Sequence, residues 1–392
     1  MDTNDFIGSF AQENVAFTTR VVRTTRVGDI YWKAMIFVEN SRFVDSSDAA
    51  WTTVPGSVTI KALTVTADDY ATYTSGLLKS WLYDLFCNGF TGDCILVACG
   101  PNVDPEGDPA VTAAEFIENM TTAYELMKAY AYHKTVLAGS ATIDATYASI
   151  AVELCKLCAA DKGLLSSAPY LPYTTSTPET TSSDVVYAAV SAASADAFMS
   201  AYQDATRNAA LYSLGLAMSI LNGSGTCVGN SMDMIKSNNI ASSGAEGTGL
   251  TKPIRAILTA ANIQSFKPVG DNSGNVAAIG AKTLKGDVVQ ATWIIAYITY
   301  MVKVEVARMI TVPNFLKNAD SYSQILGIMS NYLSKFGSSG SGRLDKISVT
   351  APGFGALPEA KDDVIIVPDA WSATYVDQVR EVQITGTLYI GA

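Results

Sequence analysis

Residues 30–165 alternate between short apolar runs and longer amphipathic stretches. The runs 30–39 and 58–66 are rich in β-branched and aromatic side chains, which is typical of strands. Residues 94–98 are wholly apolar, as expected of a strand buried in a parallel sheet, and 133–139 predict one more strand. Because helical patterns separate these runs, the order predicts βαβ units and an α/β fold (mixed α+β) with a parallel or mixed sheet.

Capping residues mark where the helices of this region begin. Thr66 and Asp69 have the spacing of a capping box, and Thr112 and Glu115 repeat it. Each box predicts a helix that begins there, and a further helix is predicted over 144–163. The apolar face of the first helix, which Gly89 is expected to end, consists of Leu77, Leu78, Trp81, Leu82, Leu85 and Phe86.

Two stretches rich in small polar residues interrupt this pattern. Residues 172–184 form a Ser/Thr/Pro-rich segment and 230–249 a Gly/Ser/Asn-rich one, so both predict mobile loops. Between them, the Ala-rich stretch 184–221 predicts continuous helix. We place the main domain boundary in the second loop, so that 30–249 forms one α/β domain.

Residues 250–378 predict a second α/β unit, and 379–392 a final strand. Its helices are predicted over 288–310 and 319–336, and its strands over 275–283, 343–349 and 363–367. The long helix places Trp293, Tyr297, Tyr300 and Val304 on one face.

Near both ends of the chain, apolar and polar residues alternate with a period of two, which is the pattern of a strand. Residues 1–29 form a polar arm that includes Val15, Phe17 and Val21. In 379–392, the apolar positions Val382, Ile384, Leu388 and Ile390 alternate with polar ones and predict a strand with one buried face. A strand at the end of a chain can pair with another chain, because no loop ties its far end.

The composition predicts an assembly. Only 16% of residues are charged, against roughly 25% in ordinary soluble domains, and mean hydropathy is +0.20. Such a chain is expected to bury more surface than its own fold can cover. The net charge of −11 argues against nucleic acid and anionic membranes as partners, and the apolar runs are too short for a span. We expect a soluble intracellular chain without membrane insertion.

Candidate chemistry is sparse. The CKLC pair, Cys155 and Cys158, lies inside a predicted helix without a second pair to complete a zinc site, which favours core packing. The segment 274–283 departs from the phosphate-binding loop pattern, because five residues separate its glycines and Ala281 precedes Lys282. The single histidine, His133, has no motif-coded nucleophile near it. No catalytic, cofactor or metal site is therefore expected.

Four segments carry a family resemblance: 66–100, 131–170, 280–310 and 375–392. The first contains a helix, a glycine turn and an apolar strand, and the second contains a strand, a helix and a strand-like exit. The third contains a turn followed by a long helix, and the fourth is a terminal strand. In this order the chain resembles the contractile tail sheath proteins of bacteriophages and related injection systems.

The resemblance implies a non-catalytic subunit that stacks in hexameric rings around an inner tail tube and contracts to drive that tube through a host envelope. The implied partners are other copies of the chain, the tube protein, and baseplate and tail terminator proteins, in a virion tail assembled in the host cytoplasm. The arm and the final strand would be exchanged between subunits, through Val15, Phe17 and Val21 and through the C-terminal apolar positions. The domain 30–249 would face outward and 250–378 the tube, which Lys317 and Lys335 would help to contact.

Two other interpretations stay open. One is a soluble enzyme or ligand-binding protein of the doubly wound α/β type, with a site at the strand C-termini near Gly100 or Gly139. No glycine-rich phosphate fingerprint follows either strand, which counts against it. The other is a different shell or tube component of a virion, which the α/β order disfavours because tube proteins are usually smaller and β-dominated.

Overall fold

A computed structural model of the chain provides the structure, and the statements below concern the residues that it describes. These are 33–38, 51–57, 60–70, 76–90, 92–99, 112–127, 133–136, 145–160, 165–170, 182–193, 197–201, 207–219, 236–237, 252–268, 276–310, 316–340, 342–357 and 370–376.

A seven-stranded mixed sheet forms the body of the molecule, in the order β2-β3-β4-β1-β5-β6-β7. Strands β4, β1, β5, β6 and β7 run parallel, while β2 and β3 are antiparallel to their neighbours. The predicted α/β fold with a mixed sheet is confirmed. The strands are β1 (Lys33–Val38), β2 (Thr52–Thr53), β3 (Lys61–Val65), β4 (Asp93–Ala98), β5 (His133–Val136), β6 (Leu165–Tyr170) and β7 (Ala197–Ala201).

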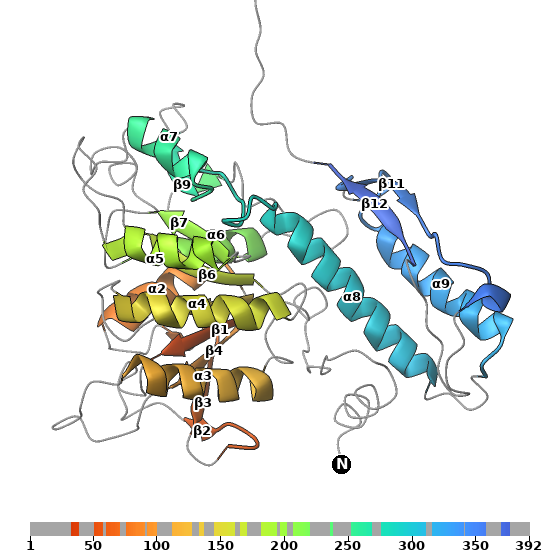
Figure 1. Cartoon of the computed structure of the whole chain (residues 1–392), viewed down its shortest axis with the longest axis horizontal. Coiled ribbons are helices and arrows are strands. Elements are labelled where there is room, and N and C mark those ends of the chain that lie inside the picture. Colours follow the sequence, from red (N-terminus) through yellow and green to blue (C-terminus); the bar gives the residue numbers. More distant parts are fainter. Residues whose placement is uncertain are drawn as a thin grey trace, which may run out of the picture.

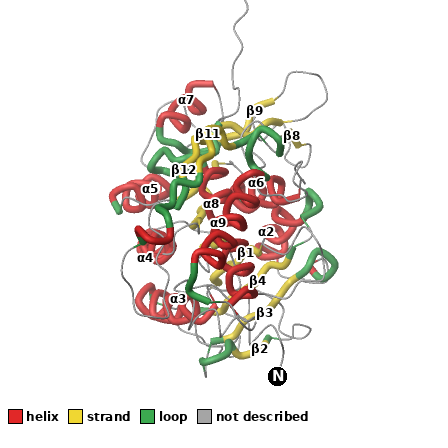
Figure 2. The backbone as a smooth tube through the Cα atoms, turned by 90° about the vertical axis from the view of Figure 1, so that its right-hand side faces the viewer, coloured by secondary structure: helices red, strands yellow, loops and turns green. Residues whose placement is uncertain are grey.

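The central strands are apolar on both faces because helices cover both sides of the sheet. In β1, Ile36 points into one buried cluster while Met35 and Phe37 point into the other, as the period of a strand requires. Figure 2 shows α3, α4 and α5 on one side of the strands and α2 and α6 on the other. The helices are α2 (Gly76–Phe86), α3 (Ala113–Met127), α4 (Ala145–Ala160), α5 (Ser182–Ala192), α6 (Ala209–Ser219) and α7 (Lys252–Ala260).

One of the two predicted capping boxes forms. The backbone N–H of Thr112 donates to the Glu115 carboxylate at 3.0 Å, and the N–H of Glu115 donates to the Thr112 hydroxyl at 3.3 Å, so the start of α3 is confirmed. The helix start at Thr66 is wrong, since α2 begins at Gly76. There the Thr66 hydroxyl donates to the Asp69 carboxylate, which closes a turn rather than capping a helix.

The predicted continuous helix over 184–221 is also wrong, because a strand divides it. Strand β7 lies between α5 and α6, and all five of its residues are buried. It pairs with β6 on one side and is bridged by Gln264 and Thr283 on the other. Tertiary pairing therefore overrides the helix preference of these alanines. Of the predicted loop 172–184, residues 182–184 belong to α5, and the remainder lies outside the described residues.

The outer edge of β7 is closed by a buried polar network. The Gln264 backbone exchanges hydrogen bonds with Met199 and Ala201, at 2.9 and 2.8 Å. Its side-chain oxygen accepts hydrogen bonds from the hydroxyls of Ser200 and Ser213. These bonds satisfy the buried amide oxygen and fix the strand edge to α6, so this side of the sheet is not an open edge.

The remaining elements follow β7 along the chain. A three-stranded antiparallel sheet has the order β8-β10-β9, and β8 lies inside the predicted loop 230–249. A two-stranded sheet pairs β11 with β12. The elements are β8 (Lys236–Ser237), β9 (Ser265–Pro268), β10 (Val276–Ile279), α8 (Val289–Ile310), α9 (Ala319–Ser334), β11 (Leu344–Ser348), η4 (Phe354–Ala356) and β12 (Ser372–Tyr375).

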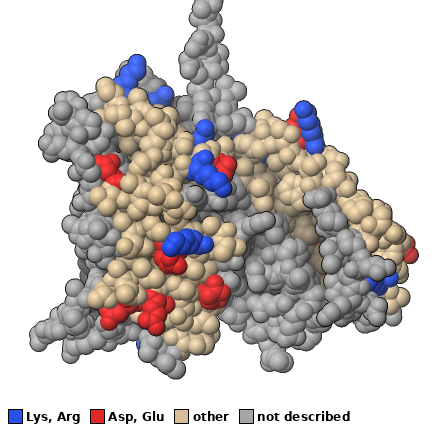
Figure 3. Space-filling view, viewed as in Figure 1, with Lys and Arg blue, Asp and Glu red and all other residues tan. Residues whose placement is uncertain are grey.

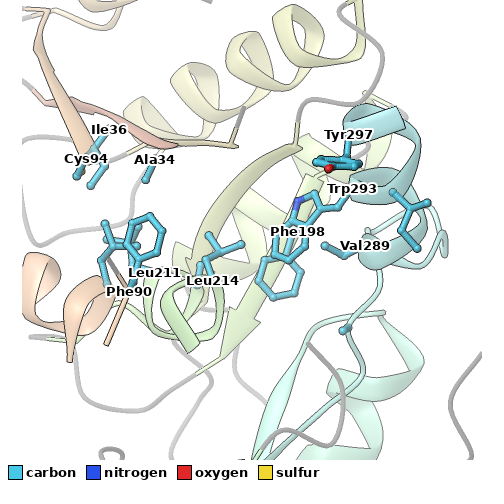
Figure 4. Close-up of a cluster of buried hydrophobic side chains, with 14 of the residues drawn as sticks. Ala34, Ile36, Phe90, Cys94, Phe198, Leu211, Leu214, Val289, Trp293 and Tyr297 are labelled. Atoms are coloured by element: carbon cyan, nitrogen blue, oxygen red, sulfur yellow. The ribbon is translucent and has the colours of Figure 1, made fainter. Parts of the chain in front are cut away.

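Helix α8 connects the large sheet to these C-terminal elements (Figure 1). Its first turns pack on the sheet, where Trp293 lies beside Phe198 of β7 (Figure 4). Further along, Tyr297 makes edge contacts with Tyr332 and Phe336 of the α9 region, at centroid distances of 6.3 and 5.7 Å. The predicted long helix is confirmed, and Trp293, Tyr297 and Val304 of its predicted face are buried, while the side chain of Tyr300 lies outside what the structure describes.

Gly215 allows α2 and α6 to cross in backbone contact. A Cβ atom at this position would collide with the backbone carbonyl of Leu85. The two helices therefore approach as closely as they do only because Gly215 has no side chain.

We expect the substitution Gly215→Ala to lower the free energy of unfolding by about 1–3 kcal/mol, because the helices must separate. Gly327→Ala on α9 is the matched control, since a Cβ there meets nothing within 4 Å. It should be neutral or stabilising by about 0.5–1 kcal/mol, as alanine favours helix. Chemical denaturation of the unassembled chains measures both, and equal stability of the two variants would contradict the close crossing.

Candidate assembly surface

The two-stranded sheet of β11 and β12 is the feature best suited to contact another chain. The strands pair antiparallel, with Leu344 opposite Tyr375 and Asp345 opposite Thr374. Their register then shifts before Ser348, and Lys346 at this bulge has a positive φ of 49°. Within the described residues the sheet has no third strand, so each strand has an outer edge.

The hydrogen bonds at the two ends of β12 show which of its residues direct their backbone groups toward β11. The N–H of Val376 donates to the carbonyl of Arg343 at 2.8 Å, and the carbonyl of Ala370 accepts from the N–H of Thr350 at 3.1 Å. Even-numbered residues of β12 therefore direct their backbone groups toward β11. Because these groups alternate along a strand, Ala373 directs its N–H and C=O toward the outer edge.

The two outer edges differ in character. Along β11, Asp345 and Lys346 are exposed and the strand is bulged, while the N–H of Leu344 already donates to the carbonyl of Phe336 at 2.7 Å. Charges and bulges of this kind protect edge strands from further pairing. The segment 370–376, by contrast, contains no charged residue and shows no bulge on its own side. The outer edge of β12 is thus the better acceptor for an added strand.

Side-chain hydrogen bonds fix β12 and the segment after β11 to the helices α8 and α9. The Tyr375 hydroxyl donates to the side-chain oxygen of Gln290, in the first turn of α8, at 2.6 Å. The Tyr322 hydroxyl of α9 donates to the carbonyl of Pro352, in the segment that follows β11, at 2.6 Å. Strand β12 is therefore anchored to the helix that also packs on the large sheet.

The residues predicted to be exchanged between subunits lie outside the described residues. This applies to Val15, Phe17 and Val21 in the arm, and to the final strand with Val382, Ile384, Leu388 and Ile390. The predicted strand over 363–367 and the proposed ligand positions at Gly100 and Gly139 lie outside them as well. The outer edge of β12 belongs to a strand that ends seven residues before Val382.

Lys317 and Lys335 lie at opposite ends of α9. Lys317 precedes the N-cap residue Asn318 and is exposed, whereas Lys335 is the C-cap and lies over the Tyr332 ring at 4.2 Å. Because the two lysines are eighteen residues apart, the rise of a helix separates them by about 27 Å along its axis. The two lysines cannot form one local site, although both could meet an extended surface.

Of the described cysteines, four are buried in the core and Cys87 is half-buried. Cys155 and Cys158 are both buried on α4, as the sequence indicated. Burial raises the pKa of the Cys94 and Cys99 thiols, and it raises the pKa of Cys87 to about 12. These thiols therefore stay protonated at neutral pH and are poor nucleophiles and metal ligands.

No described part of the chain gathers three or more metal-ligating side chains. His133 lies on β5, paired between β1 and β6. Among the helices described, none has the length and hydropathy needed to cross a membrane.

A buried ion pair was missed by sequence reasoning. The Asp84 side chain, fully buried on α2, accepts hydrogen bonds from the Arg207 guanidinium and, at 2.7 Å, from the backbone N–H of Asn208 before α6. Arg207 also lies over the Tyr83 ring at 5.5 Å. The partners are 123 residues apart in sequence, so no local pattern could reveal the contact. The ion pair joins α2 to the start of α6, the two helices that cross at Gly215.

These features define a class: an α/β protein with a seven-stranded mixed sheet, helices on both faces, and a two-stranded sheet carried on a long helix. A solved structure has a similar fold, namely a chain in the cryo-EM structure of the anti-feeding prophage (AFP) baseplate, 6-fold symmetrised. The TM-score is 0.58 at 12% identity, over 95% of this chain and 98% of that one. No protein-family model matches the sequence. No curated protein matches it either.

We expect Asp84→Ala to lower the free energy of unfolding by about 3–5 kcal/mol, because it leaves the Arg207 charge partly buried without its carboxylate. Glu153→Ala is the control, since it removes an exposed ion pair with Lys156 on α4. That pair should contribute under about 1 kcal/mol. Urea denaturation of both variants makes the comparison, and losses of similar size would contradict a structural role for the buried pair.

Proposed function

We propose that this chain is a structural, non-catalytic subunit of a contractile injection system and that it forms the contractile sheath. The observation that carries the proposal is the fold shared with a chain of the AFP baseplate assembly over nearly the full length of both. The uncharged outer edge of β12 and the low charge of the chain support a role in repeated assembly.

In the proposed arrangement, copies of the chain stack as hexameric rings around an inner tube. The arm 1–29 and the final strand 379–392 of neighbouring copies add to the β11–β12 sheet, and β12 is the acceptor. Main-chain hydrogen bonds of an added strand persist while the bodies rotate about the linking segments. The domain 30–249 faces outward and 250–378 faces the tube, with Lys317 and Lys335 toward it.

Contraction would draw its energy from contact area between subunits, without nucleotide hydrolysis. The partners would be further copies of the chain, the tube protein, and the baseplate and terminator proteins of a tail assembled in the host cytoplasm. The AFP match also favours a second candidate, a baseplate subunit that does not contract. The two differ in what the purified chain builds, since a sheath subunit forms long tubes and a baseplate subunit forms at most closed rings.

Removal of residues 379–392 tests the donated strand. We expect the shortened chain to stay folded with an unchanged melting transition, since every described element lies before residue 377. It should form no tubes under negative-stain electron microscopy at concentrations where the full chain forms them. Tubes that persist after the deletion would overturn strand donation by the C-terminus.

The substitution Ala373→Pro tests the acceptor edge itself. Proline removes the outward N–H of Ala373 and leaves the bonds from β12 to β11 in place, as is tolerated on edge strands. We expect a folded chain whose assembled fraction in sedimentation falls at least about tenfold, because a ladder hydrogen bond is lost at every contact and the ring obstructs the added strand.

Ala373→Thr is the matched control, because threonine keeps the N–H and favours strand. It should assemble like the unmodified chain. If Ala373→Pro assembled equally well, β12 would not be the acceptor. If the unmodified chain formed only closed rings, the baseplate candidate would replace the sheath.

A further inference from the structure

The sheet of β11 and β12 is closed to further pairing where β11 begins. A tight turn precedes β11, and the carbonyl of Phe336 in this turn accepts a hydrogen bond from the N–H of Leu344 at 2.7 Å. The turn also lies against the strand, since a Cβ atom on Gly337 would meet the side chain of Ile347 at 3.0 Å. A strand added on this side would therefore find the first donor of β11 already bonded.

A bulge protects the remainder of the β11 edge. Between Asp345 and Ser348, β11 contains one residue more than its partner strand, and Lys346 there has a positive φ of 49°. Such a conformation costs a residue with a side chain about 1–2 kcal/mol. Figure 3 shows acidic and basic side chains together over β11, at the upper right of this face. Bulges and charges are features that keep a further strand from pairing with an edge.

The outer edge of β12 is regular and uncharged by contrast. Ala373 directs its N–H and C=O outward, and the segment 370–376 contains no charged residue. On the inner face Ala373 and Tyr375 pack against the cluster that includes α8, while Thr374 on the other face is exposed. The sheet can therefore grow only beyond β12. The proposed function adds two strands to this sheet, so only one of them can lie next to β12.

The two candidate strands differ in charge. Residues 382–392 contain no charged residue, whereas 15–23 contain Arg20 and Arg23. Charged side chains are typical of edge strands, because they keep a further strand from pairing. A strand that lies between two others has no edge to protect. The composition therefore favours the final strand as the inner of the two and the arm as the outer.

We propose that the sheet is completed in a fixed order, in which the final strand of one neighbouring copy pairs with β12 and the arm of a further copy pairs with that strand. The two charged strands, β11 and the arm, then lie at the two edges. Such a sheet accepts two strands and no more, which prevents open-ended pairing. The inference rests on the proposed function and deepens it by naming the contact that each end of the chain makes.

Cysteine cross-linking of assembled full-length chains tests the order, because only adjacent strands bring two Cα atoms within the roughly 4–7 Å that a disulfide spans. Thr374→Cys places a thiol on the exposed face of β12, and Asp345→Cys places one at the paired position of β11. Each is combined with one cysteine at a position expected on the same face of a terminal strand: Gln383→Cys, Thr385→Cys, Thr387→Cys or, in the arm, Thr18→Cys.

We expect Thr374→Cys to link different chains through at least one position of the final strand, at least about tenfold above the single-cysteine variants after mild oxidation. It should not link to Thr18→Cys, whereas Thr18→Cys should link to a cysteine in the final strand. Asp345→Cys is the matched control and should link to neither terminal strand. Buried native thiols such as Cys94 and Cys99 add little background, because burial raises their pKa and keeps them protonated.

The order is overturned if Asp345→Cys links to either terminal strand, or if Thr374→Cys links to the arm instead of the final strand. Links within single chains, seen as monomers of altered mobility, would contradict the exchange between copies.

Electron microscopy of the same samples separates these results from the fate of the proposed function. Tubes without the expected links would support the sheath and contradict the order. Chains that link as expected but build only closed rings would support the order and replace the sheath with the baseplate candidate. Chains that neither assemble nor link would contradict both.

Discussion

The packing of helix α8 against both the large sheet and α9 is the interaction on which the rest of the structure depends. One buried cluster runs from Ile36 of β1 through Trp293 of α8 to Phe336 after α9. A helix of 22 residues extends about 33 Å, so it carries the C-terminal elements away from the sheet while remaining part of its core. The position of the β11–β12 sheet relative to the body is set by this helix.

That arrangement separates two kinds of surface on one chain. The edge of β12, anchored to α8 by the bond between Tyr375 and Gln290, offers main-chain groups without charge. Helix α3 presents exposed carboxylates, and α7 carries basic residues in its first turn. Main-chain pairing at an edge is directional and survives rotation of the bodies, whereas exposed charge contacts are weak and depend on salt. An assembly of the proposed kind, whose subunits stay linked while they rotate, needs contacts of both kinds.

Much of the sheet could be predicted from sequence, because strands such as β1 and β4 are short apolar runs that only burial on both faces explains. The capping box at Thr112 is equally local and proved correct. Strand β7 was missed, since its five residues lie between Ala-rich helices and are fixed by pairing with distant segments. The pairing of β12 with β11 and the Asp84–Arg207 pair were missed for the same reason, as both depend on partners far away in the chain.

The central claim is that β12 gains a strand from a neighbouring copy, and amide hydrogen exchange over residues 370–376 tests it most directly. The unassembled chain and the assembled form are compared at equal pH and temperature. The account predicts that the outward amide of Ala373 exchanges at least about tenfold more slowly after assembly, while the amide of Val376, already bonded to Arg343, changes little. Equal exchange at Ala373 in both forms would contradict strand addition at this edge.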